Sequence, residues 1–208
     1  MLKKRITKKA FLRCGQSNSF NVQPLPEIRD SNSKEELIQQ CDEVSAALAA
    51  FVRSIPLEYL NSRGYPEGWT PAKNVRHVCN TVRLISRWLS APGWVIRLAG
   101  KAPRRQPSIQ SIRPTNRPAQ YDYGTYKKTK PADPAQREEL AQKVIQTFEG
   151  LKTSIDKRTE EEFESRKGMF GGMGLRLFTL FSIKHAVFHI SVVRTRLLAT
   201  GEAERSAV

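Results

Sequence analysis

Apolar residues recur every three or four positions in four separate stretches of the chain, which is the spacing of an amphipathic helix. Three of these stretches carry a single apolar stripe: residues 34–54, residues 70–91 and residues 134–155. The fourth, residues 175–200, is apolar on most of its circumference, and such a helix belongs in the middle of a bundle. The pattern predicts an all-α fold, a four-helix bundle.

Capping residues mark where the helices begin and end. Ser33, Thr70 and Asp133 stand at N-cap positions, and the last two are followed by proline, which suits the first helical position. Gly201 follows the last helix, where glycine commonly ends one. We therefore expect the bundle to occupy residues 31–201.

The shorter connections are expected to be irregular. Residues 57–69 contain glycine and proline, and residues 156–167 are strongly charged, which indicates a solvated extension or turn. Residues 168–174 are glycine-rich, with Met169 and Phe170 as apolar anchors. The sequence shows no convincing strand and no internal repeat.

The longest connection, residues 94–132, is basic and proline-rich. A short helix is expected over 94–100, and tyrosines are interleaved with the basic residues that follow. Residues 97–130 are then either an arm that binds nucleic acid or another polyanion, or a solvated crossover between two helices that do not lie side by side. The crossover is favoured, because a basic loop without a known binding motif is weak evidence. The basic residues after position 103 are Arg104, Arg105, Arg113, Arg117, Lys127, Lys128 and Lys130.

Charge and cysteine content bound the environment of the protein. The 208 residues carry a net charge of +15, which attracts polyanions but defines no fold. Residues 1–30 are expected to be a disordered basic tail, with an organelle transit peptide as the alternative. Four basic residues interrupt 175–200, so no membrane span is expected.

The three cysteines are scattered, with no CxxC pair, which favours a reducing compartment and so the cytoplasm. Cys41 and Cys79 fall on apolar stripes and are expected to be small core residues, not nucleophiles.

All three histidines lie inside two predicted helices. His185 and His189 are four residues apart and so share one face, and His77 lies two turns into the second helix. Two such imidazoles can bind one metal ion, as in HExxH, although Ala186 replaces the glutamate of that motif. Buried imidazoles are costly without partners, and three histidines with an open fourth position are typical of a reactive metal site. The alternative is that they are hydrogen-bonded core histidines.

Two short motifs resemble the DinB/YfiT-like superfamily: Trp69-Thr70-Pro71-Ala72 with His77, and the His185/His189 pair. The resemblance covers residues 34–200. It implies a four-helix bundle with a long crossover between helices two and three. It also implies a divalent metal held by the three histidines, commonly zinc or nickel, with iron or manganese as further candidates. Characterised relatives include transferases that use low-molecular-weight thiols, such as bacillithiol or mycothiol, and a few metal-dependent hydrolases.

One position departs from that family, and one residue adds to the candidate site. Family members often have glutamine three residues after the second histidine, where this chain has Val192. No acidic residue lies in 175–200, so the sequence names no general base. Arg196 lies on the same face as the histidine pair and would bind an anionic substrate; the alternative is a surface arginine whose apolar stem covers the helix end.

Three functions remain open. The protein is a metal-dependent thiol transferase or hydrolase acting on a small molecule, or a metal-containing binding protein without catalysis, or a helical protein that binds nucleic acid and has structural histidines. Basic residues of 104–130 around a histidine pocket would favour an anionic substrate, and a remote basic face would favour a polyanion. Homodimer formation is a further expectation.

Overall fold

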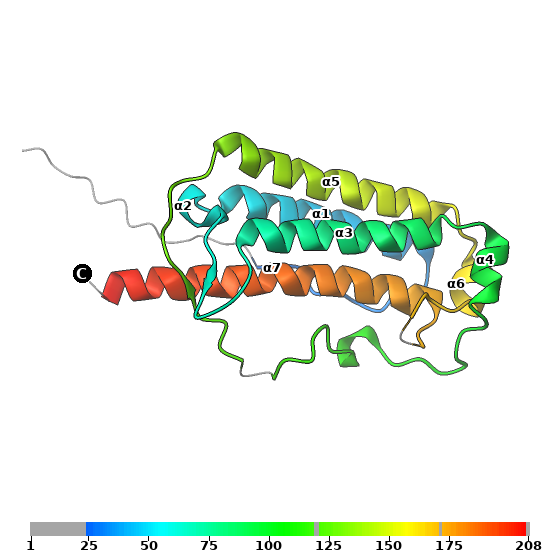
Figure 1. Cartoon of the computed structure of the whole chain (residues 1–208). Coiled ribbons are helices and arrows are strands. Elements are labelled where there is room, and N and C mark those ends of the chain that lie inside the picture. Colours follow the sequence, from blue (N-terminus) through cyan, green and yellow to red (C-terminus); the bar gives the residue numbers. More distant parts are fainter. Residues whose placement is uncertain (1–23, 119–120, 171, 207–208) are drawn as a thin grey trace, which may run out of the picture.

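Four long helices pack lengthwise in the computed structural model, which describes residues 24–118, 121–170 and 172–206 (Figure 1). Short elements connect them, including a two-stranded antiparallel pairing of Gly64 with Tyr126 and Tyr65 with Thr125. The all-α bundle predicted from the sequence is confirmed. The elements are α1 (Lys34–Ser54), α2 (Leu57–Leu60), β1 (Gly64–Tyr65), α3 (Pro71–Leu89), α4 (Gly93–Leu98), η1 (Ile109–Ser111), β2 (Thr125–Tyr126), α5 (Pro134–Asp156), α6 (Glu160–Ser165) and α7 (Leu175–Ser206).

The predicted helix starts are confirmed by their caps. The side chains of Ser33, Thr70 and Asp133 each accept a hydrogen bond from a backbone N–H in the first turn of the helix that follows. These bonds satisfy amides that have no partner inside the helix. Local chemistry thus fixes where α1, α3 and α5 begin.

The apolar stripes of the helices together form the core, and this core includes Cys41 and Cys79. Cys41 and Cys79 are fully buried and free. Burial raises the pKa of both thiols, that of Cys41 to about 12. Both therefore stay protonated in the core, as the sequence predicted, and neither is suited to nucleophilic chemistry.

Helices α3 and α5 run parallel and pack side by side, which explains the long connection between them (Figure 1). Parallel neighbours require the chain to return along the length of the bundle, whereas α1 and α7 run in the opposite direction. The interpretation of 94–132 as a crossover holds, but its stated reason was wrong, since the two helices do lie side by side.

The crossover lies along the outer face of α7 and is fixed to it. Lys184 Nζ donates to the carbonyl oxygen of Ile109 at 2.7 Å, and the Tyr126 amide donates to Thr200 Oγ1 at 2.8 Å. The side chain of Ile109 is fully buried. Helix α7 is apolar nearly all round because α3 and α1 cover one side and the crossover covers another, not because helices surround it.

Of the helices in the described part of the chain, one, α7, is long and apolar enough to cross a membrane, judged by length and composition alone. An 18-residue window has a mean hydropathy of 1.2, and half of that window is buried inside the bundle. The expectation that its basic residues exclude a span on length and composition was therefore wrong. The helix uses this apolar surface to contact α3, α1, α6 and β2.

Several local expectations are corrected. The charged stretch 156–167 contains α6, which begins with a Thr159–Glu162 capping box and buries Phe163. Residues 57–69 contain α2 and β1 instead of one loop. Met169 and Phe170 are 38% and 49% exposed, so neither is a buried anchor, although the Phe170 ring contacts Phe178. The short helix expected over 94–100 is confirmed as α4.

Both chain ends also differ from expectation. Helix α7 continues past Gly201, which is buried within it, to Ser206. Residues 24–30 pack on the bundle: Ile28 is buried, and the Arg29 amide donates to Gln40 Oε1 at 2.8 Å. The prediction of a disordered tail is therefore wrong for residues 24–30, and residues 1–23, with the transit-peptide alternative, lie outside the described part of the chain.

Candidate metal centre

The antiparallel packing of α3 on α7 brings the three histidines together. His185 Nε2 lies 3.4 Å from His77 Nε2 and 3.1 Å from His189 Nε2. One ligand nitrogen from each residue lies within 4.8 Å of the other two. The three residues that the sequence singled out therefore form one cluster.

The spacing of these nitrogens fits a metal ion. A tetrahedral zinc site with Zn–N distances of roughly 2.0–2.1 Å holds its ligand atoms about 3.3 Å apart. The two short Nε2–Nε2 distances, 3.1 and 3.4 Å, lie on either side of that value. The donor set, three imidazoles, suits zinc and nickel, and also copper and iron.

Hydrogen bonds behind the cluster fix which nitrogen faces it. His189 Nδ1 lies 3.2 Å from Asn74 Oδ1, and His185 Nδ1 lies 3.1 Å from the carbonyl oxygen of Pro114. Asn74 presents its oxygen to His189 because its Nδ2 donates to the Thr70 carbonyl at 3.1 Å. These oxygens only accept, so each Nδ1 carries the proton and each Nε2 turns its lone pair toward the cluster. Such outer partners are typical of metal-binding histidines.

Burial and neighbouring positive groups keep His77 and His189 uncharged. Burial, followed by the neighbouring His185, His77 and Arg117, lowers the pKa of His189 to about 3. Burial and His185 also lower the pKa of His77. Both imidazoles are therefore neutral at neutral pH, the form that binds metal.

Trp69 forms one wall of the cluster. Its ring meets His77 edge to face with centroids 5.1 Å apart and stacks on His189 at 6.0 Å. The Trp69-Thr70-Pro71 motif thus has a physical role, because Thr70 and Pro71 start α3 and thereby position both Trp69 and Asn74.

A cavity of about 350 Å³ opens beside His189. Its walls come from the segment before α3, from α7 and from the crossover. Val192 lines it, at the position where the DinB/YfiT-like superfamily often has glutamine. The lining residues are Glu67, Gly68, Trp69, Asn74, Arg117, Tyr123, Phe188, His189, Val192 and Arg196.

Arg196 lies in the wall of this cavity and is only 4% exposed. The alternative of a surface arginine is therefore wrong. Its Nη2 donates to the backbone oxygen of Glu67 at 2.6 Å. Its place on the face of the histidine pair is as predicted, and its role with a substrate is taken up below.

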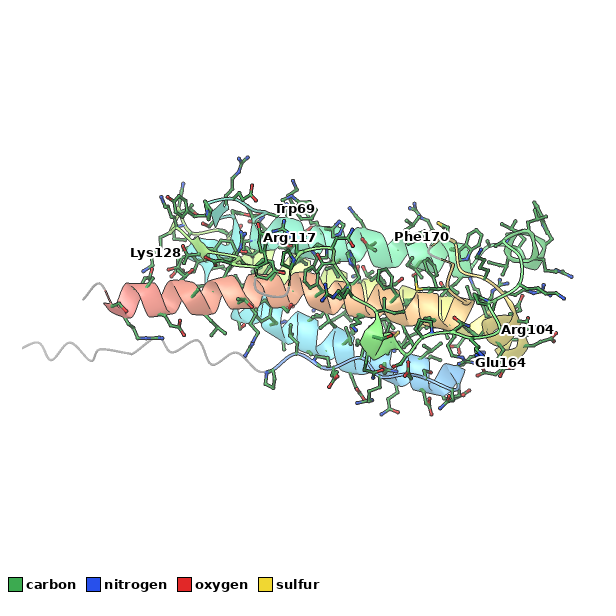
Figure 2. All side chains as sticks on the ribbon, turned by 90° about the horizontal axis from the view of Figure 1, so that it is seen from below. Trp69, Arg104, Arg117, Lys128, Glu164 and Phe170 are labelled. Carbon is green, nitrogen blue, oxygen red and sulfur yellow. The ribbon has the colours of Figure 1, made fainter. Side chains whose placement is uncertain are left out.

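The basic residues of the crossover are spread out. Figure 2 shows Arg117 beside Trp69, with Arg104 toward one end of the bundle and Lys128 toward the other. Arg117 lines the cavity and Arg104 and Lys128 do not. Basic residues of the crossover thus lie both at the cavity and away from it.

Sequence reasoning missed several contributors. Asn74 had a signal, since it lies three residues before His77 and shares its helix face. Pro114 and Tyr123 had none, because they reach the site from irregular backbone, and Arg117 was named only as one of the basic residues of the crossover. Glu67 is the acidic residue among those lining the cavity, and its carboxylate accepts from the Tyr121 hydroxyl at 3.3 Å.

Comparison of the chain with protein-family models, with curated proteins and with solved structures gives no match in any of the three. The resemblance to the DinB/YfiT-like superfamily therefore rests on the short motifs, the helical fold and the three-histidine cluster.

Proposed function

We propose that His77, His185 and His189 bind one divalent metal ion, zinc or nickel before iron or manganese, and leave a coordination position open. The observation that carries this proposal is the convergence of three imidazole Nε2 atoms, two of them held by Nδ1 hydrogen bonds. Convergent lone pairs repel one another unless a cation lies between them.

A metal ion bound there would lower the pKa of a coordinated water or thiol and so supply a nucleophile at neutral pH. The residues of the chain do the rest. Asn74 and the Pro114 carbonyl orient the imidazoles, and the Trp69 and Phe188 rings pack against His189. Glu67 is placed in the cavity wall, where its carboxylate could accept a proton.

The function that this arrangement supports best is a metal-dependent transferase or hydrolase of the DinB/YfiT-like type, acting on a small molecule in the cytoplasm. The cavity has the size of a small-metabolite site and opens beside His189. A low-molecular-weight thiol is the proposed cosubstrate if the reaction is a transfer.

Metal content tests the proposal. Protein without a histidine tag, purified without chelators, is analysed by inductively coupled plasma mass spectrometry beside the His185→Ala/His189→Ala variant. We expect about one metal ion per chain in the native protein and none in the variant. No metal after incubation with nickel or zinc would contradict the proposal.

A second candidate, binding of nucleic acid or another polyanion, is supported by the spread of basic residues along the crossover (Figure 2). The logarithm of the binding constant for generic DNA and RNA should then fall linearly with the logarithm of salt concentration. No binding at low salt would exclude it.

A further inference from the structure

We infer that the cavity beside the histidines is a receptor for a carboxylate group, with Arg196 as its buried anchor and Arg117 as its second cation. This inference rests on the proposed function and adds a substrate class to it: a small organic acid. The carboxylate itself belongs either to a thiol cosubstrate or to a sulfur-free substrate.

Arg196 is a buried cation without a carboxylate partner among the described residues. Its guanidinium donates a hydrogen bond to a backbone oxygen, that of Glu67, and lies 5.7 Å from the centre of the Tyr126 ring, while its Nε has no partner among the described residues. A buried charge is expensive unless an opposite charge or a full set of hydrogen bonds compensates it. The planar fork of a guanidinium matches a carboxylate, which can accept two parallel hydrogen bonds. A bound carboxylate would supply the charge that the protein lacks.

Two glycines shape the wall around this guanidinium. A Cβ atom placed on Gly64 would lie 1.1 Å from Arg196 Nη1, and one placed on Gly68 would lie 2.0 Å from it. Gly68 also has a φ of +140°, which side chains rarely adopt. The backbone before α3 therefore makes room for the guanidinium at the cavity wall and holds it there, as expected of a binding group and not of a mobile surface residue.

Arg117 supplies a second, exposed cation from the crossover. Its guanidinium lies over the Tyr121 ring at 4.3 Å and 5.9 Å from the centre of the Tyr123 ring. It is exposed, lines the same cavity and lies near enough to His189 to contribute to the lowering of that residue's pKa. Arg117 and Arg196 thus give the cavity two positive charges against one acidic residue, Glu67.

The dimensions favour a small acid over a polymer. Arg196 follows His189 by two helical turns on the same face, a rise of roughly 10 Å. Long side chains on a helix lean toward its N-terminus, which here means toward His189. A carboxylate at Arg196 would therefore place a group a few bonds away near the histidine cluster, within a cavity of about 350 Å³.

The test uses metal-free protein, so that its outcome does not depend on metal binding. Calorimetric titration at low salt compares glutarate with its uncharged diamide, glutaramide. We expect glutarate to bind at least about tenfold more tightly, because a hydrogen bond from a guanidinium to a carboxylate is roughly twice as strong as one between neutral groups. Arg196→Gln should abolish this preference, and Arg117→Gln should reduce it. Equal binding of the two probes, or an unchanged preference in Arg196→Gln, would overturn the inference.

Matched variants separate binding from folding. Arg83→Gln removes the same charge from an exposed position on α3 outside the cavity lining and should leave glutarate binding unchanged. Arg196→Lys keeps the charge but not the fork and should bind glutarate more weakly than the native chain. If Arg196→Gln does not fold, the exposed Arg117→Gln variant and the two probes decide: no preference for glutarate, or no loss in Arg117→Gln, overturns the inference.

Metal content of the same variants keeps the two proposals apart. Arg196→Gln should retain metal, since it removes no imidazole. If the native protein binds glutarate but no metal, only the proposed function is contradicted. If it binds metal but shows no preference for glutarate, only this inference is contradicted. On nickel-loaded protein, 3-mercaptopropionate and glutarate are then compared. If 3-mercaptopropionate binds more tightly and its binding depends on Arg196, the carboxylate belongs to a thiol cosubstrate. If the two bind equally and both depend on Arg196, the carboxylate belongs to a sulfur-free substrate. Independence from Arg196 would overturn the inference.

Discussion

At the scale of single residues, two carbonyl oxygens behind His185 and His189 fix the orientation of these imidazoles. Pro114 and Asn74 supply them, so one comes from the crossover and the other from the helix that also carries His77. Without such acceptors each imidazole could protonate either nitrogen and rotate. The two oxygens therefore determine that the Nε2 lone pairs face the cluster.

Replacing Asn74 by leucine should weaken metal binding by roughly 10- to 100-fold, the usual cost of losing an outer partner of a metal-binding histidine. A competition titration of zinc against a chelating indicator measures the affinity. Asn74→Asp, which keeps an acceptor oxygen at this position, should retain the native affinity within about tenfold. Equal losses in both variants would mean that Asn74 does not act through its acceptor.

Sequence could predict the histidines but not all of their surroundings. His77, His185 and His189 stand on regular helices, where spacing converts directly into a shared face. The burial of Arg196 depends on two glycines of a different segment, Gly64 and Gly68, and helix periodicity carries no information about such a contact.

At the scale of elements, the end of α7 shows how tertiary contacts override a local signal. Gly201 would end an isolated helix, yet α7 continues because its last turn has partners. The Tyr59 hydroxyl on α2 donates to the Glu204 carboxylate, and Lys128 Nζ in the crossover lies 3.1 Å from it. These contacts join the end of α7 to α2 and to the segment after β2.

Glu204 should make this helix end sensitive to acid. The hydrogen bond from Tyr59, followed by Lys128, lowers the pKa of Glu204 below its usual value. Because the folded pKa lies below the unfolded one, the stabilisation is present above the unfolded value, about 4.3, and is lost as the pH falls through the folded pKa.

Glu204→Gln should therefore lower the free energy of unfolding at pH 7 by less than about 1 kcal/mol, since the carboxylate is partly exposed. It should also flatten the loss of stability below about pH 5. Urea unfolding across this pH range measures both effects. Glu202→Gln is the control, because Glu202 lies on the same turn but its carboxylate forms no ion pair among the described residues, and an equal change in both variants would contradict the assignment to Glu204.

Element boundaries were predictable where side chains next to the helix fix them. Helix α1 spans 34–54 as expected, and α5 ends at Asp156, one residue later than expected. Helix α6 was missed because its capping box and a single apolar residue, Phe163, lie in a charged stretch. The strands β1 and β2 have two residues each, too few for an alternating pattern to appear.

At the scale of the whole molecule, the site joins two helices that are distant in sequence. His77 comes from α3, and His185 and His189 come from α7. A metal ion held by all three would bind the folded chain and not the unfolded one, and so would stabilise the bundle.

Each tenfold rise in free zinc above the dissociation constant should add about 1.4 kcal/mol to the free energy of unfolding, reaching about 4 kcal/mol at a thousandfold excess. Chemical unfolding at a series of buffered zinc concentrations measures this dependence. The His185→Ala/His189→Ala variant should show no such rise. A rise of the same size in that variant would place zinc elsewhere on the chain.

Sequence reasoning about the whole molecule reached the bundle and the crossover but not the direction of the helices. Apolar stripes show which face of α3 is buried and not whether α5 runs parallel or antiparallel to it. Homodimer formation and cytoplasmic location stay predictions, to be measured by sedimentation equilibrium and by imaging of the full-length chain.

The crossover separates two tasks that could evolve, or be engineered, independently. The bundle helices supply the three imidazoles, whereas Arg117 and Tyr123 of the crossover form the opposite wall of the cavity. Substitutions in this wall leave the apolar core unchanged and so carry little risk to folding. Under the proposed function, libraries that vary Arg117 and Tyr123 would therefore change the choice of small molecule while the three imidazoles are retained.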